Sequence, residues 1–345
     1  MTRFAYMPDS HFGVYDMGVP TRDVVHAANE QCILEAVAAE RAGFDGIWVP
    51  ERHHRTETFL PSPIVTLAAI AARTNRIRIA PTVMQPTYYN PMHVAEQLAQ
   101  IDQLSKGRLI FGAGVGYHQD YFKLFGVEQK GTGRRFAECM EVIDRAWREE
   151  RLTFKGEFFD FDDVLMTPKP YQRPRPPIWI GAFYDKAIER ALEWDGWCWW
   201  FPPKLDEAAE KIDYWRAKAE RKRGPNNWTV AIAYEGWVGK DAEAVRKRHG
   251  HRWVKEAEFY VDRGLSPDMA VDPLESLEER YLILGTPTYW IERIGAVIER
   301  LKPEWIGIRT RTPDPGGDAP AYPSLQENLE NIQMLGEEVI RYFQK

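Results

Sequence analysis

The stretch NPMHVAEQLAQIDQLSKGRLIFGAGVG, residues 90–116, decides the fold because it contains one complete helix-to-strand unit. Asn90 and Pro91 are typical of a helix start, where asparagine caps free amide groups and proline already has the backbone angle of the first helical residue. A helical pattern runs to Gly107. RLIFGAGVG then reads as a short apolar strand that ends in a glycine turn. The stretch predicts a helix over 90–107 and a strand over 108–116.

The same alternation extends from this unit in both directions. Helical patterns cover 23–43, 62–74, 136–150, 205–223 and 325–343, and strands are predicted at 3–7, 44–50, 76–84, 108–116, 178–183, 196–201, 228–238 and 305–310. Eight strands in one continuous series with helices predict an α/β fold, a closed (β/α)8 TIM barrel, rather than an open doubly wound sheet. We expect one domain over 1–345, with 156–177 as a proline-rich connection and 239–284 as a helical insertion.

Composition excludes several classes of protein. The chain has 44% hydrophobic and 28% charged residues, as soluble globular proteins do, and its net charge of −6 is spread without a basic stripe, so nucleic acid is not an expected partner. Cys32, Cys139 and Cys198 lie far apart, which indicates neither disulfides nor a zinc ribbon. No signal sequence and no apolar run near the ~18 residues of a membrane span is visible. We therefore expect a soluble, cytoplasmic protein that does not bind membranes.

In a TIM barrel the working residues lie in the loops at the carboxyl ends of the strands. ERHH, residues 51–54, is such a loop. Neighbouring side chains on an extended chain point to opposite faces, so His53 and His54 could not easily bind one metal ion, and no metal is expected. An imidazole suits proton transfer instead, and Glu51 could orient it. His118, after the fourth strand, either acts in the site or only caps its loop.

Other histidines are weaker candidates. His11 lies in the loop after the first strand and is a further site candidate. Four more fall on helical patterns and are expected to be exposed: His26, His93, His249 and His251.

Residues 90–116, together with GFDGIWVPERHH (43–54), IAART (70–74) and PIWIGAFYDKAIERALEWDGW (177–197), resemble the bacterial luciferase-like family of flavin-dependent monooxygenases. The resemblance implies a homodimer that takes reduced FMN from a separate flavin reductase and uses O2 to oxidise a small organic substrate. A sister branch of the family transfers hydride with the deazaflavin F420 on the same fold. A barrel that binds flavin without turnover is a third possibility.

The resemblance also implies where the cofactor lies. The flavin ring would lie against a bulge at Pro81–Met84 that often contains a non-prolyl cis peptide, and its phosphate near the turn at 181–183. The chain departs from the luciferase branch there, because it lacks a hydroxyl side chain in that turn and has Val115 in place of an arginine. The cofactor-binding candidates are Tyr6, Thr82, Val83, Met84, Gly114, Val115, Gly116, Tyr117, Gly181, Ala182 and Phe183.

The remaining candidates concern chemistry and substrate. By the same resemblance a histidine of the ERHH loop faces the flavin and the substrate, so His53 and His54 are catalytic candidates. His118 is a further catalytic candidate because it lies in the loop after the fourth strand. Aromatic residues near the mouth suit a hydrophobic or aromatic substrate and would exclude water. The substrate-pocket candidates are His11, Phe12, Tyr88 and Trp199.

Overall fold

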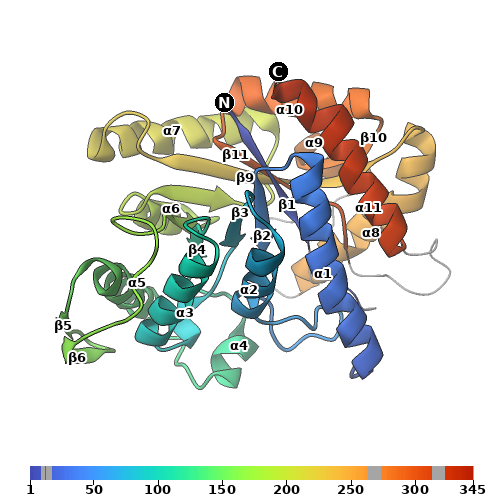
Figure 1. The fold of residues 1–345 in the computed structure, drawn as a ribbon. Coiled ribbons are helices and arrows are strands. Elements are labelled where there is room, and N and C mark those ends of the chain that lie inside the picture. Colours follow the sequence, from blue (N-terminus) through green and yellow to red (C-terminus); the bar gives the residue numbers. More distant parts are fainter. Residues whose placement is uncertain (9–11, 13–17, 263–272, 313–322, 345) are drawn as a thin grey trace.

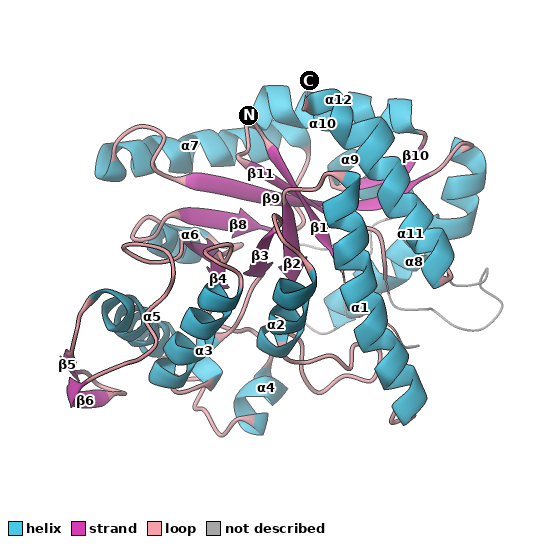
Figure 2. Ribbon diagram, viewed as in Figure 1, coloured by secondary structure: helices cyan, strands magenta, loops and turns pink. Residues whose placement is uncertain are grey.

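The computed structural model describes residues 1–8, 12, 18–262, 273–312 and 323–344. Eight parallel strands form a ring that helices surround (Figures 1 and 2). The strands are β1 (Arg3–Met7), β2 (Gly46–Val49), β3 (Arg78–Pro81), β4 (Phe111–Ala113), β7 (Ile178–Gly181), β8 (Gly196–Trp199), β9 (Thr229–Val238) and β11 (Trp305–Arg309). Their order is β3-β2-β1-β11-β9-β8-β7-β4, and two isolated bridges, Ile79–Leu109 and Met84–Ala113, join β4 back to β3. The predicted TIM barrel is confirmed.

Helices cover the outer side of the ring (Figure 2). They are α1 (Arg22–Ala42), α2 (Pro63–Arg73), α3 (Pro91–Leu104), α4 (Gln119–Leu124), α5 (Thr132–Arg148), α6 (Asp185–Ala191), α7 (Leu205–Arg223), α8 (Ala242–Asp262), α9 (Leu274–Arg280), α10 (Pro287–Leu301), α11 (Leu325–Met334) and α12 (Arg341–Phe343), with a 3-10 turn at Pro86–Tyr88 and a π segment at Leu335–Ile340. The predicted helix starts are confirmed: the Asn90 side chain accepts a hydrogen bond from the Met92 amide at 2.9 Å, and Ser62 caps α2 in the same way.

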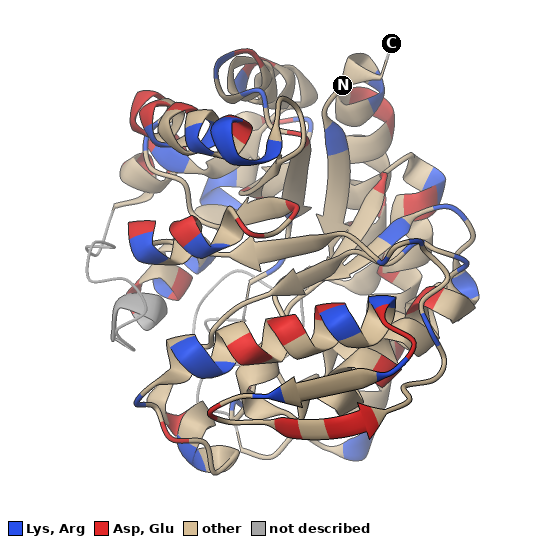
Figure 3. Cartoon of the chain, turned by 90° about the vertical axis from the view of Figure 1, so that its left-hand side faces the viewer, with Lys and Arg blue, Asp and Glu red and all other residues tan. Residues whose placement is uncertain are grey.

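Three strands lie where the sequence did not predict them. β5 (Leu152–Lys155) and β6 (Asp160–Val164) form an antiparallel hairpin that extends into the expected connection 156–177, and β10 (Leu282–Gly285) pairs with β9 inside 239–284. β6 is exposed and carries three aspartates, which strands disfavour, so its pattern was hidden (Figure 3). The Glu138 carboxylate of α5 stabilises the hairpin turn by accepting hydrogen bonds from the Glu157 and Phe158 amides at 2.7 and 2.9 Å.

Large aromatic rings fill the barrel interior. Trp179 packs edge-on against Trp48 and Trp305, with ring centroids 6.1 and 5.6 Å apart. These rings fit because the strands carry glycine opposite them: a Cβ on Gly307 would lie 2.1 Å from the Trp48 ring, and one on Gly46 would lie 2.8 Å from the Trp305 ring. The interior is therefore a packed core, and a ligand has to bind above it, at the carboxyl ends of the strands.

Candidate active site at the carboxyl ends of the strands

The loop after β2 separates the two adjacent histidines. His53 is buried, and its Nε2 lies 2.9 Å from Glu51 Oε1. His54 is exposed and has a left-handed backbone, with φ of 52°. The turn thus directs only His53 into the protein.

Glu51 connects the β2 loop to the loop after β3. Its Oε2 accepts a hydrogen bond from the Gln85 backbone amide at 2.5 Å, and its Oε1 accepts one from the Tyr89 hydroxyl as well as contacting His53. The Gln85 side-chain amide donates in turn to the Glu51 carbonyl oxygen at 3.3 Å. Burial, followed by the nearby Glu51 carboxylate, raises the pKa of Tyr89 well above its usual value, so this phenol stays protonated.

Aromatic rings surround the His53 imidazole. The rings of Phe125, Tyr121 and Tyr88 lie 4.8, 5.5 and 6.4 Å from it, each close to perpendicular. They come from α4, from the residue that follows it and from the turn after β3. Such rings exclude water from the imidazole and strengthen its polar contacts.

His118 and Tyr117 belong to the loop after β4. His118 is the N-cap of α4, since its Nδ1 accepts a hydrogen bond from the Asp120 amide at 3.3 Å, and its ring stacks on Tyr121. The structure therefore gives His118 the capping role that the sequence left open. The Tyr117 ring is partly exposed at the mouth, where its hydroxyl accepts a hydrogen bond from Arg55 at 3.1 Å.

The ends of β3, β4 and β7 meet in a tightly packed floor. The Thr82–Val83 peptide is cis, which confirms the non-prolyl cis bond expected there. The Val83 side chain lies between two glycines, because a Cβ on Gly114 or on Gly181 would come within 2.7 Å of one of its γ-methyl groups. A Cβ on Gly112 would lie only 2.2 Å from the Pro81 carbonyl oxygen. Large side chains are thereby kept out of this floor.

Two buried polar atoms at this floor lack partners. Within the described residues, Thr82 Oγ1 and Gln85 Oε1 make no hydrogen bond. Beside them, Gly116 has φ of 89°, and a Cβ there would lie 2.4 Å from the Tyr88 hydroxyl. A floor of small residues with unsatisfied hydrogen-bonding atoms at its edge fits a flat ring with polar edges, as a flavin has.

The turn after β7 fits the expected phosphate cradle less well. The Ala182 amide donates to the Cys198 carbonyl oxygen at 3.3 Å, so it is not available to an anion. Lys211 of α7 donates to the Phe183 carbonyl oxygen at 3.1 Å and pairs with Asp185 at 3.4 Å. Lys211 is therefore a basic group close to this turn, although its ammonium already has protein partners.

Several predicted site residues face away from the mouth. The Tyr6 hydroxyl lies between the barrel and its helices, 3.0 Å from Thr310 Oγ1 and 3.2 Å from Asn328 Nδ2. Trp199 stacks on Trp197, with centroids 4.8 Å apart, and lies against Lys211 of α7. Side chains alternate across a strand, so Cys198 faces the interior and Trp199 the helices, while Trp200 packs 6.1 Å from Trp48. The structure does not bring Tyr6 and Trp199 to the mouth.

The other predicted residues divide as follows. Met84 is buried in the outer core, and its backbone pairs with β4. The Val115 carbonyl oxygen accepts a hydrogen bond from Thr87 Oγ1 at 2.7 Å. Phe12 packs under Arg311, whose guanidinium carbon Cζ lies 4.0 Å from the centroid of the Phe12 ring. His11 lies outside the described residues.

An ion cluster on the other side of the mouth was missed. Arg309 of β11 contacts Glu235 of β9 at 2.5 Å and makes paired 2.7 Å hydrogen bonds with Glu256 of α8, and all three side chains are buried. Glu235 shares the inner face of β9 with Ala231 and Ala233. An acidic residue on the inward side of the apolar strand WTVAIAYEGWV was the signal that could have identified it.

His249 was predicted to be exposed, and this prediction was wrong. Its ring is buried and stacks on Trp237, with centroids 4.4 Å apart. Burial, and after it the charge of the neighbouring Arg252, lowers the pKa of His249 to about 3. His249 is thus a neutral core residue of α8.

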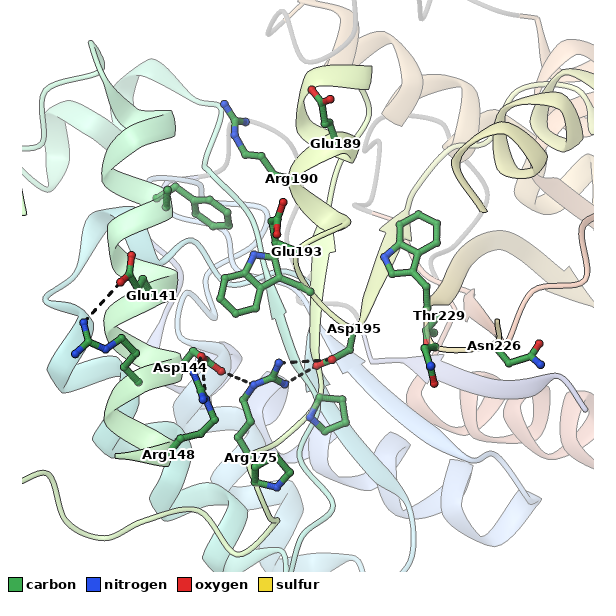
Figure 4. A pocket seen from close by; sticks show the side chains of 18 of the residues that line it. Glu141, Asp144, Arg148, Arg175, Glu189, Arg190, Glu193, Asp195, Asn226 and Thr229 are labelled. Carbon is green, nitrogen blue, oxygen red and sulfur yellow. Dashed lines mark hydrogen bonds and ion pairs between the residues drawn. The ribbon is translucent and has the colours of Figure 1, made fainter. Parts of the chain in front are cut away.

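A separate cavity lies at the opposite end of the barrel from these residues. It measures about 1210 Å³ and lies between α5 and α6 at the amino ends of β7, β8 and β9, where Arg175 bridges Asp144 and Asp195 (Figure 4). Barrel enzymes place their chemistry at the opposite end, so we do not assign the active site to this cavity. Within the described residues, no three His, Cys, Asp or Glu side chains gather as metal ligands would, and no helix is long and apolar enough to cross a membrane.

The model of the luciferase-like monooxygenase family matches residues 11–302. The chain belongs to this family. It is 36% identical to limonene 1,2-monooxygenase of Rhodococcus erythropolis over 282 residues, 76% of this chain and 70% of that protein. It is also 36% identical to an F420-dependent glucose-6-phosphate dehydrogenase of Kineococcus radiotolerans, over 41% of this chain and 43% of that one.

Solved structures of luciferase-like proteins share the fold. The FMN complex of the oxygenating constituent of 3,6-diketocamphane monooxygenase from Pseudomonas putida superposes with a TM-score of 0.76 at 16% identity, over 98% of both chains. Relatives in this luciferase-like family therefore include monooxygenases and F420-dependent enzymes, which are oxidoreductases of two cofactor types.

Proposed function

We propose that the chain is the oxygenase component of a two-component, flavin-dependent monooxygenase that oxidises a small hydrophobic or aromatic substrate with O2. The observation that carries the proposal is the buried Glu51–His53 pair beside a floor of small residues. A separate flavin reductase would supply reduced FMN, and the active form would be a homodimer. The similarity to monooxygenases supports this function.

Each group of residues has a distinct part in the proposed function. The floor of Val83, Gly114 and Gly181 would hold the flat face of the cofactor, with Thr82 and Gln85 at its polar edge. When bound, reduced flavin supplies two electrons and activates O2. His53 holds and moves the proton that the reaction requires, and the surrounding aromatic rings exclude water from it.

F420-dependent hydride transfer is the second candidate, and a specific observation favours it. The Ala182 amide is engaged within the sheet and Val115 stands where the luciferase branch has an arginine, so the phosphate site departs from that branch. An F420-dependent enzyme is among the relatives. A barrel that binds flavin without turnover is the third possibility.

The test is the binding of reduced FMN and reduced F420 to the purified protein without oxygen, followed by admission of air. Tight binding of reduced FMN and a transient absorbance absent from free flavin would support the monooxygenase. Preference for F420 with no response to air would overturn it in favour of hydride transfer.

A matched pair of variants tests the role of His53. His53→Ala should lower substrate oxidation by about 10²- to 10⁴-fold, the usual contribution of a proton-transfer group, while cofactor binding is kept. His54→Ala is the control and should leave oxidation unchanged, because His54 is exposed. Equal activity of both variants would contradict the proton-transfer role of His53.

A further inference from the structure

We infer that Glu51 is a positioning residue that keeps neutral His53 protonated on Nε2 and leaves Nδ1 as the nitrogen that accepts and returns a proton at the mouth. Only the catalytic use of Nδ1 rests on the proposed function. The state of the imidazole is a property of the folded protein without cofactor or substrate.

The hydrogen bonds of Glu51 decide the direction of its contact with His53. Its two oxygens meet three donors or potential donors: the Gln85 amide, the Tyr89 hydroxyl and His53 Nε2. An ionised carboxylate only accepts hydrogen bonds, so the imidazole nitrogen that faces it carries the proton. Among the described residues no lysine or arginine pairs with Glu51, and these donors compensate its buried charge instead.

Tyr89 strengthens this assignment. Its half-buried phenol lies beside Glu51 and its pKa is raised, so it remains a donor throughout the pH range in which the protein works. The Gln85 amide belongs to the backbone and cannot become an acceptor. Both of these groups are fixed as donors, so the Glu51 oxygens that they meet act as acceptors.

The other imidazole nitrogen is left for chemistry. Nδ1 of His53 makes no hydrogen bond with the described residues, whereas Nε2 lies 2.9 Å from Glu51. A proton taken up at Nδ1 gives an imidazolium whose Nε2–H still points at the carboxylate. Returning that proton at Nδ1 restores the starting state, so the pair acts as a reversible proton carrier without net change.

The experiment reads the tautomer directly. Protein labelled with ¹⁵N in histidine is studied by long-range ¹H–¹⁵N NMR at about pH 9, well above the usual imidazole pKa of about 6.5, and His53 is assigned from the signals lost in His53→Ala. We expect a protonated Nε2 and an unprotonated Nδ1. An unprotonated Nε2 in the unsubstituted protein would overturn the inference without reference to any activity.

Two variants identify the group responsible. In Glu51→Gln the amide oxygen has to stay on the fixed Gln85 amide, so the NH2 group turns towards His53 and the proton should move to Nδ1. Tyr89→Phe removes another hydrogen bond of Glu51 but keeps the carboxylate, so the Nε2–H form should persist. An unchanged tautomer in Glu51→Gln, or a switch in Tyr89→Phe, would show that Glu51 is not the positioning group.

Turnover provides the second readout if a substrate is found. Glu51→Gln should lower kcat by about tenfold or more with little change in KM, and Glu51→Asp should restore part of the loss, because it restores an acceptor. Failure to find activity would count against the proposed function alone, since the NMR result stands without it.

Discussion

Replacing Gly114 by alanine should destabilise the protein, and shortening Val83 should cancel the effect. A Cβ at Gly114 would lie 2.7 Å from Val83 Cγ2, closer than real Cβ atoms come to a neighbour. Overpacking of this kind lowers the free energy of unfolding by about 1–3 kcal/mol. Alanine also restricts the unfolded chain more than glycine does, and this stabilises the folded state by about 0.4–1 kcal/mol. We expect a net loss of about 1–2 kcal/mol. In a Val83→Ala background the clash is absent, so alanine at 114 should be neutral or stabilising by up to about 1 kcal/mol.

The assay is urea unfolding followed by tryptophan fluorescence for the four proteins of the double-mutant cycle. The expected coupling energy between the two sites is about 1–3 kcal/mol. Gly18→Ala is the control, because no described residue lies within 4 Å of a Cβ there. Additivity within about 0.5 kcal/mol would refute the idea that Val83 fills the space between Gly114 and Gly181.

Three further predictions concern titratable groups. His249 has a pKa lowered to about 3 by burial, so its contribution to stability is complete above about pH 6.5 and is lost as the pH falls towards 3. The free energy of unfolding of His249→Phe should therefore depend less on pH in that range. Hydrogen bonds from Arg248 and from a backbone amide lower the pKa of Glu327 to about 2, so the stability that this carboxylate adds is present above about pH 4.5 and is lost towards pH 2. The difference in unfolding free energy between the wild type and Glu327→Gln should shrink over this interval. Burial raises the pKa of Cys139 and Cys198 to about 12, so neither thiol should react with a disulfide reagent at pH 8 until the protein unfolds; prompt reaction of either would contradict their burial.

The sequence predicts the barrel well because its strands and helices have strong local signals. Capping residues such as Asn90 and Ser62 marked helix starts, and apolar runs marked eight strands. Elements without such signals were missed. The acidic β6 depends on pairing with β5 in a hairpin whose turn α5 stabilises, and β10 depends on pairing with β9, so neither could be recognised from its own residues.

The site was harder to predict because it depends on side-chain direction. WCWWF is apolar at every position, so the sequence could not show that Trp199 faces the helices and Trp200 the interior. The same holds for His53 and His54, since one left-handed residue in the loop decides which of them is buried. The contacts of Glu51 with Gln85 and Tyr89 join two loops that are adjacent only in the folded barrel.

The mouth is built from two halves with different chemistry. β2, β3, β4 and β7 supply the imidazole, its carboxylate and the floor of small residues, whereas β9, β11 and α8 supply a buried ion cluster. A charge buried in such a cluster is costly to leave unpaired, so Glu256 ties α8 firmly to Arg309 on the barrel wall. The proposed cofactor and proton chemistry use only the first half. We therefore expect substitutions in α8 to change which substrate is accepted while cofactor binding is retained, because α8 is joined to the barrel wall at β11 and the floor is formed by β3, β4 and β7.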